Sequence, residues 1–209
     1  NKKNAATETV KIGLVGKYVE LQDAYKSIDE SLLHAAIYND RKLDLHLFHS
    51  EKITDENAAS QLADMDGILI APGFGQRGIE GKFSAIKFAR ENNKPLFGIC
   101  LGMQCMVIEF ARNVLGYSDA NSTEMEPNTP HKVIDMMEEQ KTVINLGGSM
   151  RLGAFDCVLK KDSKAYQAYG KEHIQERHRH RFEFNNEYKG EFEAAGMQCV
   201  GTNPDTNLV

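Results

Sequence analysis

Cys100 is the clearest candidate for a reactive residue in the chain, because it is at the centre of the turn Gly98-Ile99-Cys100-Leu101-Gly102. A G-x-C-x-G sequence between a strand and a helix has the form of a nucleophile elbow in which a thiol replaces the serine hydroxyl. The N-terminus of the following helix favours the thiolate and lowers the pKa of such a thiol. The neighbouring Leu101 N–H is placed to bind an oxyanion. A free cysteine is often only a core residue, but the two flanking glycines favour a nucleophile.

The glycine-rich loop Pro72-Gly73-Phe74-Gly75 is a second candidate part of the site. Its small residues leave backbone N–H groups accessible, and one of them could be the second oxyanion donor that acyl chemistry at Cys100 needs. Taken alone, the loop is more simply explained as a glycine-rich turn. A phosphate-binding loop is weakly supported, because the sequence has no G-x-x-x-x-G-K-[ST] match.

The basic segment 176–185 is the other unusual stretch, with the sequence ERHRHRFEFN. If it is a strand, His178 and His180 share one face with Glu176 while the arginines share the other. It could form an anion site, a metal pair or the histidine partner of Cys100, and a solvated basic edge explains it about equally well. Two histidines are too few for a convincing zinc site. From the residues alone, the general base for Cys100 is not identified.

Strands and helices alternate along the first half of the chain, and they must position these residues. Apolar strands are predicted at 10–16, 67–71 and 95–99, and a half-exposed strand at 43–49. Helices are predicted from Asp23 or Ser27 to about Asn39, from 79 to about 91, and from Leu101 to a stop at Gly116. This alternation indicates βαβ units and a mostly parallel sheet. Ligands bind beyond the carboxyl ends of such strands, where the glycine-rich loop and the elbow both fall.

The second half of the chain is expected to contain more antiparallel pairing. Shorter strands are predicted at 133–137, 143–146, 151–159 and 192–202, with a short helix at 166–169. The predicted fold class is α/β: an open, mostly parallel sheet flanked by helices, with an added antiparallel portion. We expect residues 1–9 to be a linker and residues 10–209 to form one domain.

Composition excludes several classes of function. A net charge of −5 over 209 residues argues against nucleic acid as the main partner. No apolar run approaches the length of a membrane span, and no signal peptide opens the chain. The four cysteines show neither zinc spacing nor a disulfide framework, which suits a reducing compartment. We therefore expect a cytoplasmic protein with no nucleic-acid or membrane partner.

The segment Gly98-Ile99-Cys100-Leu101-Gly102-Met103-Gln104 is similar to the nucleophile motif of the class I, triad-type glutamine amidotransferases. Four further stretches resemble, more narrowly, the glutamine amidotransferase domain of the CTP synthase family. These are residues 15–19 with 23–27 (VGKYV and DAYKS), 72–81 (PGFGQRGIEG), 121–125 (NSTEM) and 176–183 (ERHRHRFE). The resemblance covers the chain from Val10 onward and implies a flavodoxin-like fold.

The resemblance implies that the domain hydrolyses L-glutamine to glutamate and ammonia through a γ-glutamyl thioester on Cys100. Gly73 and Leu101 would supply the oxyanion-hole amides. The glutamine-binding positions would be Gly73, Leu101, Gly102, Met103, Gln104, Glu124 and Arg181. Glu124 would suit the substrate's α-ammonium group, and Arg181 would contribute largely through its backbone. Arg77 and Glu80 would lie in the lid that the family links to allosteric activation by GTP.

The resemblance also implies groups outside the 209 residues. An N-terminal synthetase domain would use ATP, Mg²⁺ and the ammonia to aminate UTP to CTP. The full-length protein would be a homotetramer. The amidotransferase domain itself would hold no cofactor or metal. The family's catalytic His and Glu would lie in a His-Pro-Glu motif beyond Val209, so residues 10–209 would be a C-terminally incomplete amidotransferase domain. We expect the fragment alone to be weakly active or inactive.

One departure and two alternatives accompany this interpretation. The family usually has Pro-Gly-Gly-Phe-Gly where this chain has Ala71-Pro72-Gly73-Phe74-Gly75, which raises the question of which amide completes the oxyanion hole. Another cysteine hydrolase of the same fold would have no use for the 121–125 and 176–183 sequences. A non-catalytic glutamine-binding or interaction module would explain the missing histidine, but would have no use for a thiol on the elbow.

Overall fold

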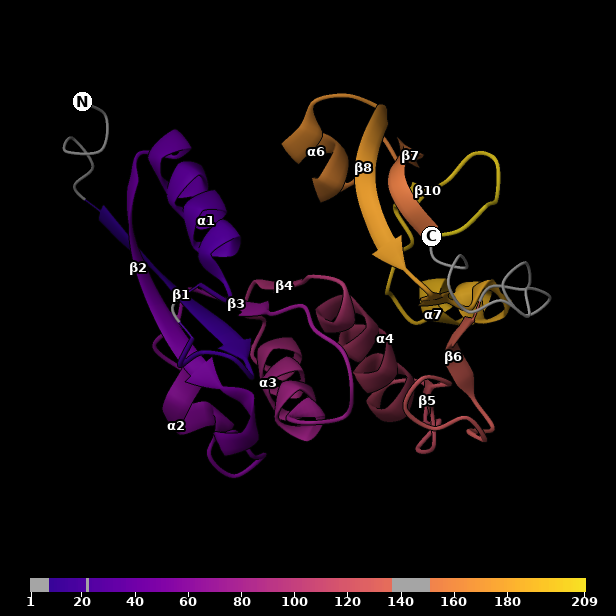
Figure 1. Cartoon of the computed structure of the whole chain (residues 1–209), viewed down its shortest axis with the longest axis horizontal. Helices are drawn as coiled ribbons and strands as arrows, with labels where there is room; N and C mark the ends of the chain where they lie inside the picture. The colour runs from indigo at the N-terminus through magenta and orange to yellow at the C-terminus, as the bar shows by residue number, and fades with distance from the viewer. Residues whose placement is uncertain (1–7, 22, 137–150) are drawn as a thin grey trace. The chain divides into compact units, whose positions relative to one another are not determined.

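The computed structural model describes residues 8–21, 23–136 and 151–209. The chain forms two compact units, Asn1–Glu109 and Phe110–Val209, and each is described by itself (Figure 1). Across the described residues, no helix combines the length and the apolar character that a membrane span requires.

The first unit is built on a parallel sheet with the strand order β2-β1-β3-β4 (Figure 1). The strands are β1 (Glu8–Gly16), β2 (Arg41–His49), β3 (Gly67–Ile70) and β4 (Leu96–Gly98). This is the order of the flavodoxin-like doubly wound fold, whose ligands bind at the β1/β3 switch point. All four residues of β3 and the last four of β1 are buried, so the core is centred on these two strands. The predicted parallel sheet is confirmed.

The helices of the first unit follow the predicted alternation. They are α1 (Lys26–Tyr38), α2 (Ala58–Leu62), α3 (Ile79–Glu91) and α4 (Leu101–Asn113), with the 3₁₀ turn η2 (Ser50–Lys52) after β2. The predicted cap of α1 was wrong: the N-cap is Tyr25, without a side-chain cap, and not Asp23 or Ser27. Tyr25 packs in the core with Leu14 and Leu69, so burial of its ring decides where the helix begins.

β4 also differs from the prediction. Residues 95–99 were expected to form a buried strand, but β4 is only partly buried and Phe97 is 63% exposed. β4 is the last strand in the described sheet and pairs only with β3. Apolar character alone does not distinguish such an edge position from a central one.

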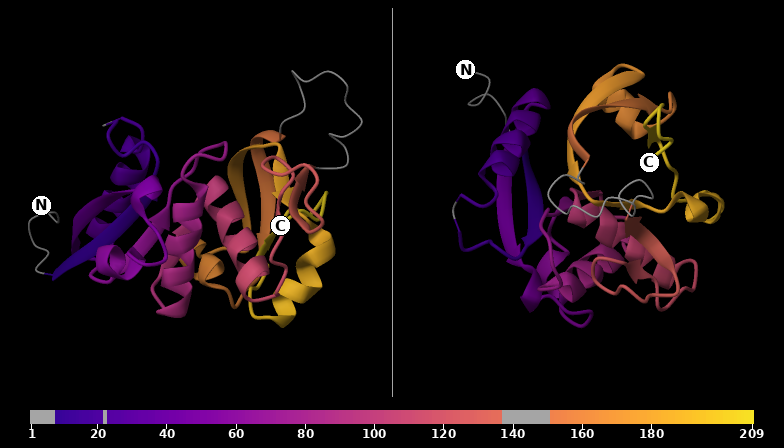
Figure 2. Two further views of the ribbon diagram at one scale, coloured as in Figure 1. Left: turned by 90° about the horizontal axis from the view of Figure 1, so that it is seen from below. Right: turned by 45° about the vertical axis from the view of Figure 1, so that its right-hand side comes forward.

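The second unit holds the antiparallel portion. One sheet has the order β10-β7-β8, with β7 (Arg151–Leu159), β8 (His173–His180) and β10 (Gly201–Thr202) all antiparallel. The paired β7 and β8 can be followed in Figure 2. The other has the order β5-β6-β9, with β5 (Asn121–Ser122), β6 (Lys132–Met136) and β9 (Phe182–Phe184). The short helices are α6 (Lys164–Tyr169) and α7 (Lys189–Ala194), with the 3₁₀ turn η3 (Asn186–Tyr188) before α7.

The strand predicted at 192–202 was wrong. Residues 189–194 form α7, and only Gly201 and Thr202 pair with β7. The Phe192 ring is 1% exposed; it stacks on the Phe110 ring, with centroids 5.5 Å apart, and meets the Phe184 ring edge to face at 5.2 Å, so this one side chain anchors the helix. The helix predicted at 166–169 is confirmed as part of α6, and the strand predicted at 143–146 lies outside the described residues.

Candidate active site

The elbow has the backbone strain that its sequence predicts. Cys100 has φ of 55°, in the left-handed region that residues with a side chain rarely adopt. The Ile99 N–H donates to the Ile70 carbonyl at 3.1 Å, and the Gly102 N–H donates to the Ile99 carbonyl at 2.8 Å. These bonds attach the turn to the end of β3 and hold the half-buried thiol at the start of α4.

Both glycines of the elbow are required by close backbone contact. A Cβ at Gly98 would lie 2.6 Å from the Gly102 carbonyl carbon, and a Cβ at Gly102 would lie 2.2 Å from the Ile70 carbonyl oxygen. These distances are far below van der Waals contact, and the opposing atoms are backbone. The prediction that the two glycines permit close backbone approach is therefore confirmed.

The two predicted oxyanion donors belong to neighbouring segments. A Cβ built on Gly73 would lie 3.7 Å from the Leu101 Cδ2 atom, so the glycine-rich loop lies close to the Leu101 side chain at the start of α4. The Gly73 and Leu101 N–H groups donate to no backbone carbonyl within the described ranges. Of the other predicted glutamine-binding residues in this unit, Gly102 is buried, Met103 is half-buried and the Gln104 N–H donates to the Cys100 carbonyl at 3.1 Å.

The Ala71-Pro72 departure leaves Gly73 as the available donor. Proline has no N–H, and the Ala71 N–H already donates to the Val15 carbonyl at 2.9 Å. Among residues 71–73, Gly73 is therefore the residue whose amide remains for an oxyanion. The sequence difference from the family does not remove that donor.

Two buried lysines hold the glycine-rich loop, and sequence analysis missed both. Lys82 of α3 is 1% exposed, and its Nζ donates to the Ala71 carbonyl at 2.7 Å. Lys17, directly after β1, is 5% exposed and donates to the Phe74 carbonyl. Burial lowers the pKa of Lys82, whereas the thiols of Cys105 and Cys100 act in the opposite direction. A signal was present, because Lys82 interrupts the apolar stripe of α3.

The predicted lid residues lie at the start of α3. Arg77 is exposed; its guanidinium carbon lies 5.4 Å from the centroid of the Tyr18 ring, and its Nη1 lies 3.6 Å from Glu51. Glu80 is exposed in the first turn of α3. The contact between Arg77 and Tyr18 joins the loop after β1 to the loop after β3. A lid role for Arg77 and Glu80 stays a prediction.

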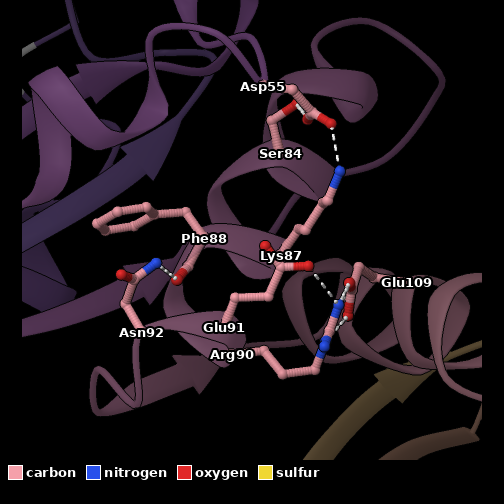
Figure 3. Close-up of polar contacts among 8 residues, drawn as sticks. All are labelled: Asp55, Ser84, Lys87, Phe88, Arg90, Glu91, Asn92 and Glu109. Carbon is pink, nitrogen blue, oxygen red and sulfur yellow. Dashed lines mark hydrogen bonds and ion pairs between the residues drawn. The ribbon is translucent and has the colours of Figure 1, made fainter.

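An ion pair ties α3 to α4 (Figure 3). Arg90 donates from Nη2 to Glu109 Oε1 at 2.8 Å and from Nε to both carboxylate oxygens at 3.1 Å. Glu109 is 1% exposed. Figure 3 also shows Lys87 and Ser84 on Asp55, at 2.6 Å each, on the other side of α3. The Arg90–Glu109 pair, whose carboxylate is buried, therefore fixes α3, the helix that carries Lys82, whereas the Asp55 contacts lie at its exposed surface.

Glu124 and Arg181 belong to the second unit. Glu124 is exposed in the turn after β5, where its N–H donates to the Ser122 hydroxyl at 3.2 Å, and Arg181 is half-buried between β8 and β9. The structure describes the elbow in the first unit and these two residues in the second. Their roles toward glutamine stay predictions.

The histidines of the basic segment gain a third neighbour in the structure. The segment does form a strand, β8, and ligand atoms of His178, His180 and Glu183 lie within 4.8 Å of one another. Glu183 is 4% exposed, and its Oε1 lies 3.9 Å from His180 Nδ1. Two imidazoles and a carboxylate are a donor set that zinc accepts, although the contact between His180 and Glu183 does not itself require a metal.

Comparison with known proteins agrees with this geometry. The family model of class I glutamine amidotransferases matches residues 20–209. The chain is 70% identical over 207 residues to the CTP synthase of Porphyromonas gingivalis and 66% identical over 209 residues to that of Bacteroides fragilis. These matches cover 99% and 100% of this chain, but only 38% and 39% of the relatives.

A solved structure also matches along most of the chain. It is the glutaminase domain of the Trypanosoma brucei CTP synthase with bound acivicin, at a TM-score of 0.87 and 38% identity. The match covers 95% of this chain and 76% of that one. The chain therefore belongs to the class I glutamine amidotransferases, among the glutaminase domains of CTP synthases.

Proposed function

We propose that the chain hydrolyses L-glutamine at Cys100 and supplies the ammonia to a synthetase domain that aminates UTP to CTP. The observation that carries the proposal is the elbow: a thiol at φ of 55° at a helix N-terminus, followed by Leu101, against whose side chain the Gly73 loop lies. The relative solved with acivicin, a glutamine analogue, supports glutamine as the substrate.

The chemistry follows from this arrangement. The Cys100 thiolate attacks the γ-carboxamide carbon of glutamine, and the Gly73 and Leu101 N–H groups donate to the oxyanion that forms. The C–N bond breaks, a proton is delivered to the nitrogen and ammonia leaves, which gives a γ-glutamyl thioester. Water then adds to the thioester carbon, glutamate leaves and the thiol is restored. By resemblance, the residues that move these protons are a histidine and a glutamate of a His-Pro-Glu motif beyond Val209.

The partners of the whole protein belong to the same proposal. The chain spans 38–39% of the length of the curated relatives. We propose that the full-length protein carries an N-terminal synthetase domain that binds ATP, Mg²⁺ and UTP, responds to GTP, assembles as a homotetramer and acts in the cytoplasm. The boundaries of the linker at 1–9 and of the domain at 10–209 stay predictions.

Acivicin labelling tests the nucleophile in the full-length protein that we propose. We expect one label, on Cys100, that excess L-glutamine prevents, and we expect Cys100→Ser to abolish both labelling and ammonia release. Cys199→Ser is the matched control, because burial raises the pKa of that half-buried thiol. Loss of the Cys199 thiol should change neither the labelling nor the ammonia release. A label on another cysteine of the folded protein would refute the assignment.

The same experiment separates the alternative of a glutamine-binding module. In that case glutamine would bind and protect Cys100 from labelling, but the wild-type protein would release no ammonia. Hydrolysis of a peptide but not of glutamine would instead indicate another cysteine hydrolase of this fold.

A further inference from the structure

We propose that Lys82 is a positioning residue for glutamine hydrolysis: its buried ammonium holds the Ala71 carbonyl and thereby orients the Gly73 N–H toward the oxyanion. The inference rests on the proposed function and adds to it a residue that touches neither substrate nor thiol. It is carried by the bond from Lys82 Nζ to the Ala71 carbonyl, 2.7 Å long and fully buried.

Packing alone does not call for a lysine at this position. The buried neighbours of Lys82 on α3 include Ile79, Phe83 and Ile86, which form an apolar stripe. A buried ammonium pays a large desolvation penalty unless its environment compensates for it. Methionine would fill the same space in the stripe without that penalty. The charge at Lys82 is therefore explained by what it binds rather than by the space it fills.

The carbonyl that Lys82 binds is at the start of the glycine-rich loop. Ala71 follows directly after β3; its N–H donates to the Val15 carbonyl and its carbonyl accepts from Lys82, so the whole residue is held. From Ala71 the chain needs only Pro72, with its fixed φ, to reach Gly73. Lys17 holds the other end of the loop through the Phe74 carbonyl. The Gly73 amide thus lies between two carbonyls that buried ammonium groups hold.

Orientation of this amide matters for rate because an oxyanion donor acts over a short distance. Removing one such donor costs about 10²- to 10³-fold in kcat, and a misplacement of about 1 Å can cost about 10²-fold. A loop that has lost one of its two anchors should still bind glutamine through its other contacts. We therefore expect the loss to appear in kcat rather than in KM.

The alternative is that Lys82 acts on the thiol itself. A negative charge on the sulfur of Cys105 or Cys100 raises the pKa of Lys82, against the effect of burial, so a thiolate at the elbow and the Lys82 ammonium attract each other. A cation that stabilised the thiolate would make Cys100 more reactive toward any electrophile. A cation that only positions the loop would leave this reactivity unchanged, because simple alkylation forms no oxyanion.

The test is Lys82→Met in the full-length protein, with Lys87→Met as the control. Lys87 lies on the same helix, but its ammonium binds Asp55 at the surface. We expect Lys82→Met to lower kcat for glutamine hydrolysis by about 10- to 100-fold and to leave KM within about threefold. The pH dependence of Cys100 alkylation by iodoacetamide, and CTP synthesis from added ammonia, should stay at wild-type values. Lys87→Met should change none of these.

Several results would overturn the proposal. An unchanged kcat in folded Lys82→Met would remove the role, and a shifted pH dependence of alkylation would assign Lys82 to the thiolate. A parallel loss of glutamine-driven and ammonia-driven synthesis would indicate general structural damage. If Lys82→Met does not fold, Lys82→Gln keeps a shorter N–H donor and should give an intermediate kcat; failure of both variants to fold would make Lys82 purely structural. If the proposed function is wrong, the wild-type protein itself releases no ammonia from glutamine.

Discussion

Replacing Gly102 by alanine tests the close approach on which the elbow depends. Two effects oppose each other in this variant. Alanine in place of glycine in a helix stabilises by about 0.5–1 kcal/mol through backbone entropy and helix propensity. Against this, the new Cβ would lie 2.2 Å from the Ile70 carbonyl oxygen and 2.9 Å from its carbon. An ordinary contact begins at 3.4 Å, so α4 and β3 must separate by about 1.2 Å.

The separation has no easy route. Ile70 is fully buried, and its carbonyl also accepts the Ile99 N–H, so moving β3 breaks a bond that holds the turn. Overpacking of a well-packed core costs about 1–3 kcal/mol, which exceeds the gain from helix propensity. We expect Gly102→Ala to lower the free energy of unfolding by about 1–2 kcal/mol. Glutamine hydrolysis should fall by about 10²-fold, because the thiol moves with α4.

Urea unfolding and steady-state kinetics of the full-length protein provide the measurements. The matched control is Gly190→Ala on α7, where a new Cβ meets nothing within 4 Å. That variant should keep full activity and gain up to about 1 kcal/mol of stability. The reasoning is wrong if Gly102→Ala is as stable and as active as Gly190→Ala.

Three further predictions concern charged and titrating groups. Arg90→Met leaves the buried Glu109 carboxylate, 1% exposed, without its guanidinium partner and should lower the free energy of unfolding, measured in urea, by about 3 kcal/mol. Adding Glu109→Leu to Arg90→Met should recover most of that loss. Equal losses in the single and the double variant would contradict this reasoning. Hydrogen bonds from Lys87 and Ser84 lower the pKa of Asp55. Because the pair is exposed, Asp55→Asn should lower the free energy of unfolding at neutral pH by under about 1 kcal/mol. This difference from the wild type should vanish as the pH falls through the pKa of Asp55 in the folded protein. The hydrogen bond to Glu176 raises the pKa of Tyr169 to about 12. The stabilisation from this bond therefore persists below pH 10 and is lost as the pH rises toward 12. Compared with the wild type, the ultraviolet titration of Tyr169→Phe should lack one late-titrating tyrosine.

Local patterns in the sequence were sufficient for the elements that are defined along the chain. The buried runs of β1 and β3, the helical spacing of α3 and α4, and the G-x-C-x-G turn each specify their structure within a few residues, and the structure has all of them. Parallel order then follows from the alternation, because βαβ crossovers permit few arrangements.

Features that depend on distant contacts could not be predicted in this way. Tyr25 begins α1 because its ring is buried against β1 and β3, and Phe192 holds α7 through the rings of Phe110 and Phe184, which belong to other elements. Lys82 in an apolar stripe was visible in the sequence, but its partner, a backbone carbonyl on another element, was not. Backbone acceptors leave no trace in side-chain patterns.

The Cys100 thiol and the Gly73 amide, our proposed oxyanion donor, take their positions from two consecutive residues, Ile70 and Ala71. The Ile70 carbonyl accepts from Ile99 and lies against Gly102, which places the elbow, while the Ala71 carbonyl accepts from Lys82, which places the loop of Gly73. The end of β3 is thus a common reference point for the proposed nucleophile and the proposed oxyanion donor. The strain of a left-handed cysteine, about 1–2 kcal/mol, is tolerated here because the Ile99 and Gly102 N–H groups on either side of it are both hydrogen-bonded. Covalent labelling and hydrolysis should respond together to changes at Ile70 but separately to changes at Lys82, because only the second leaves the thiol in place.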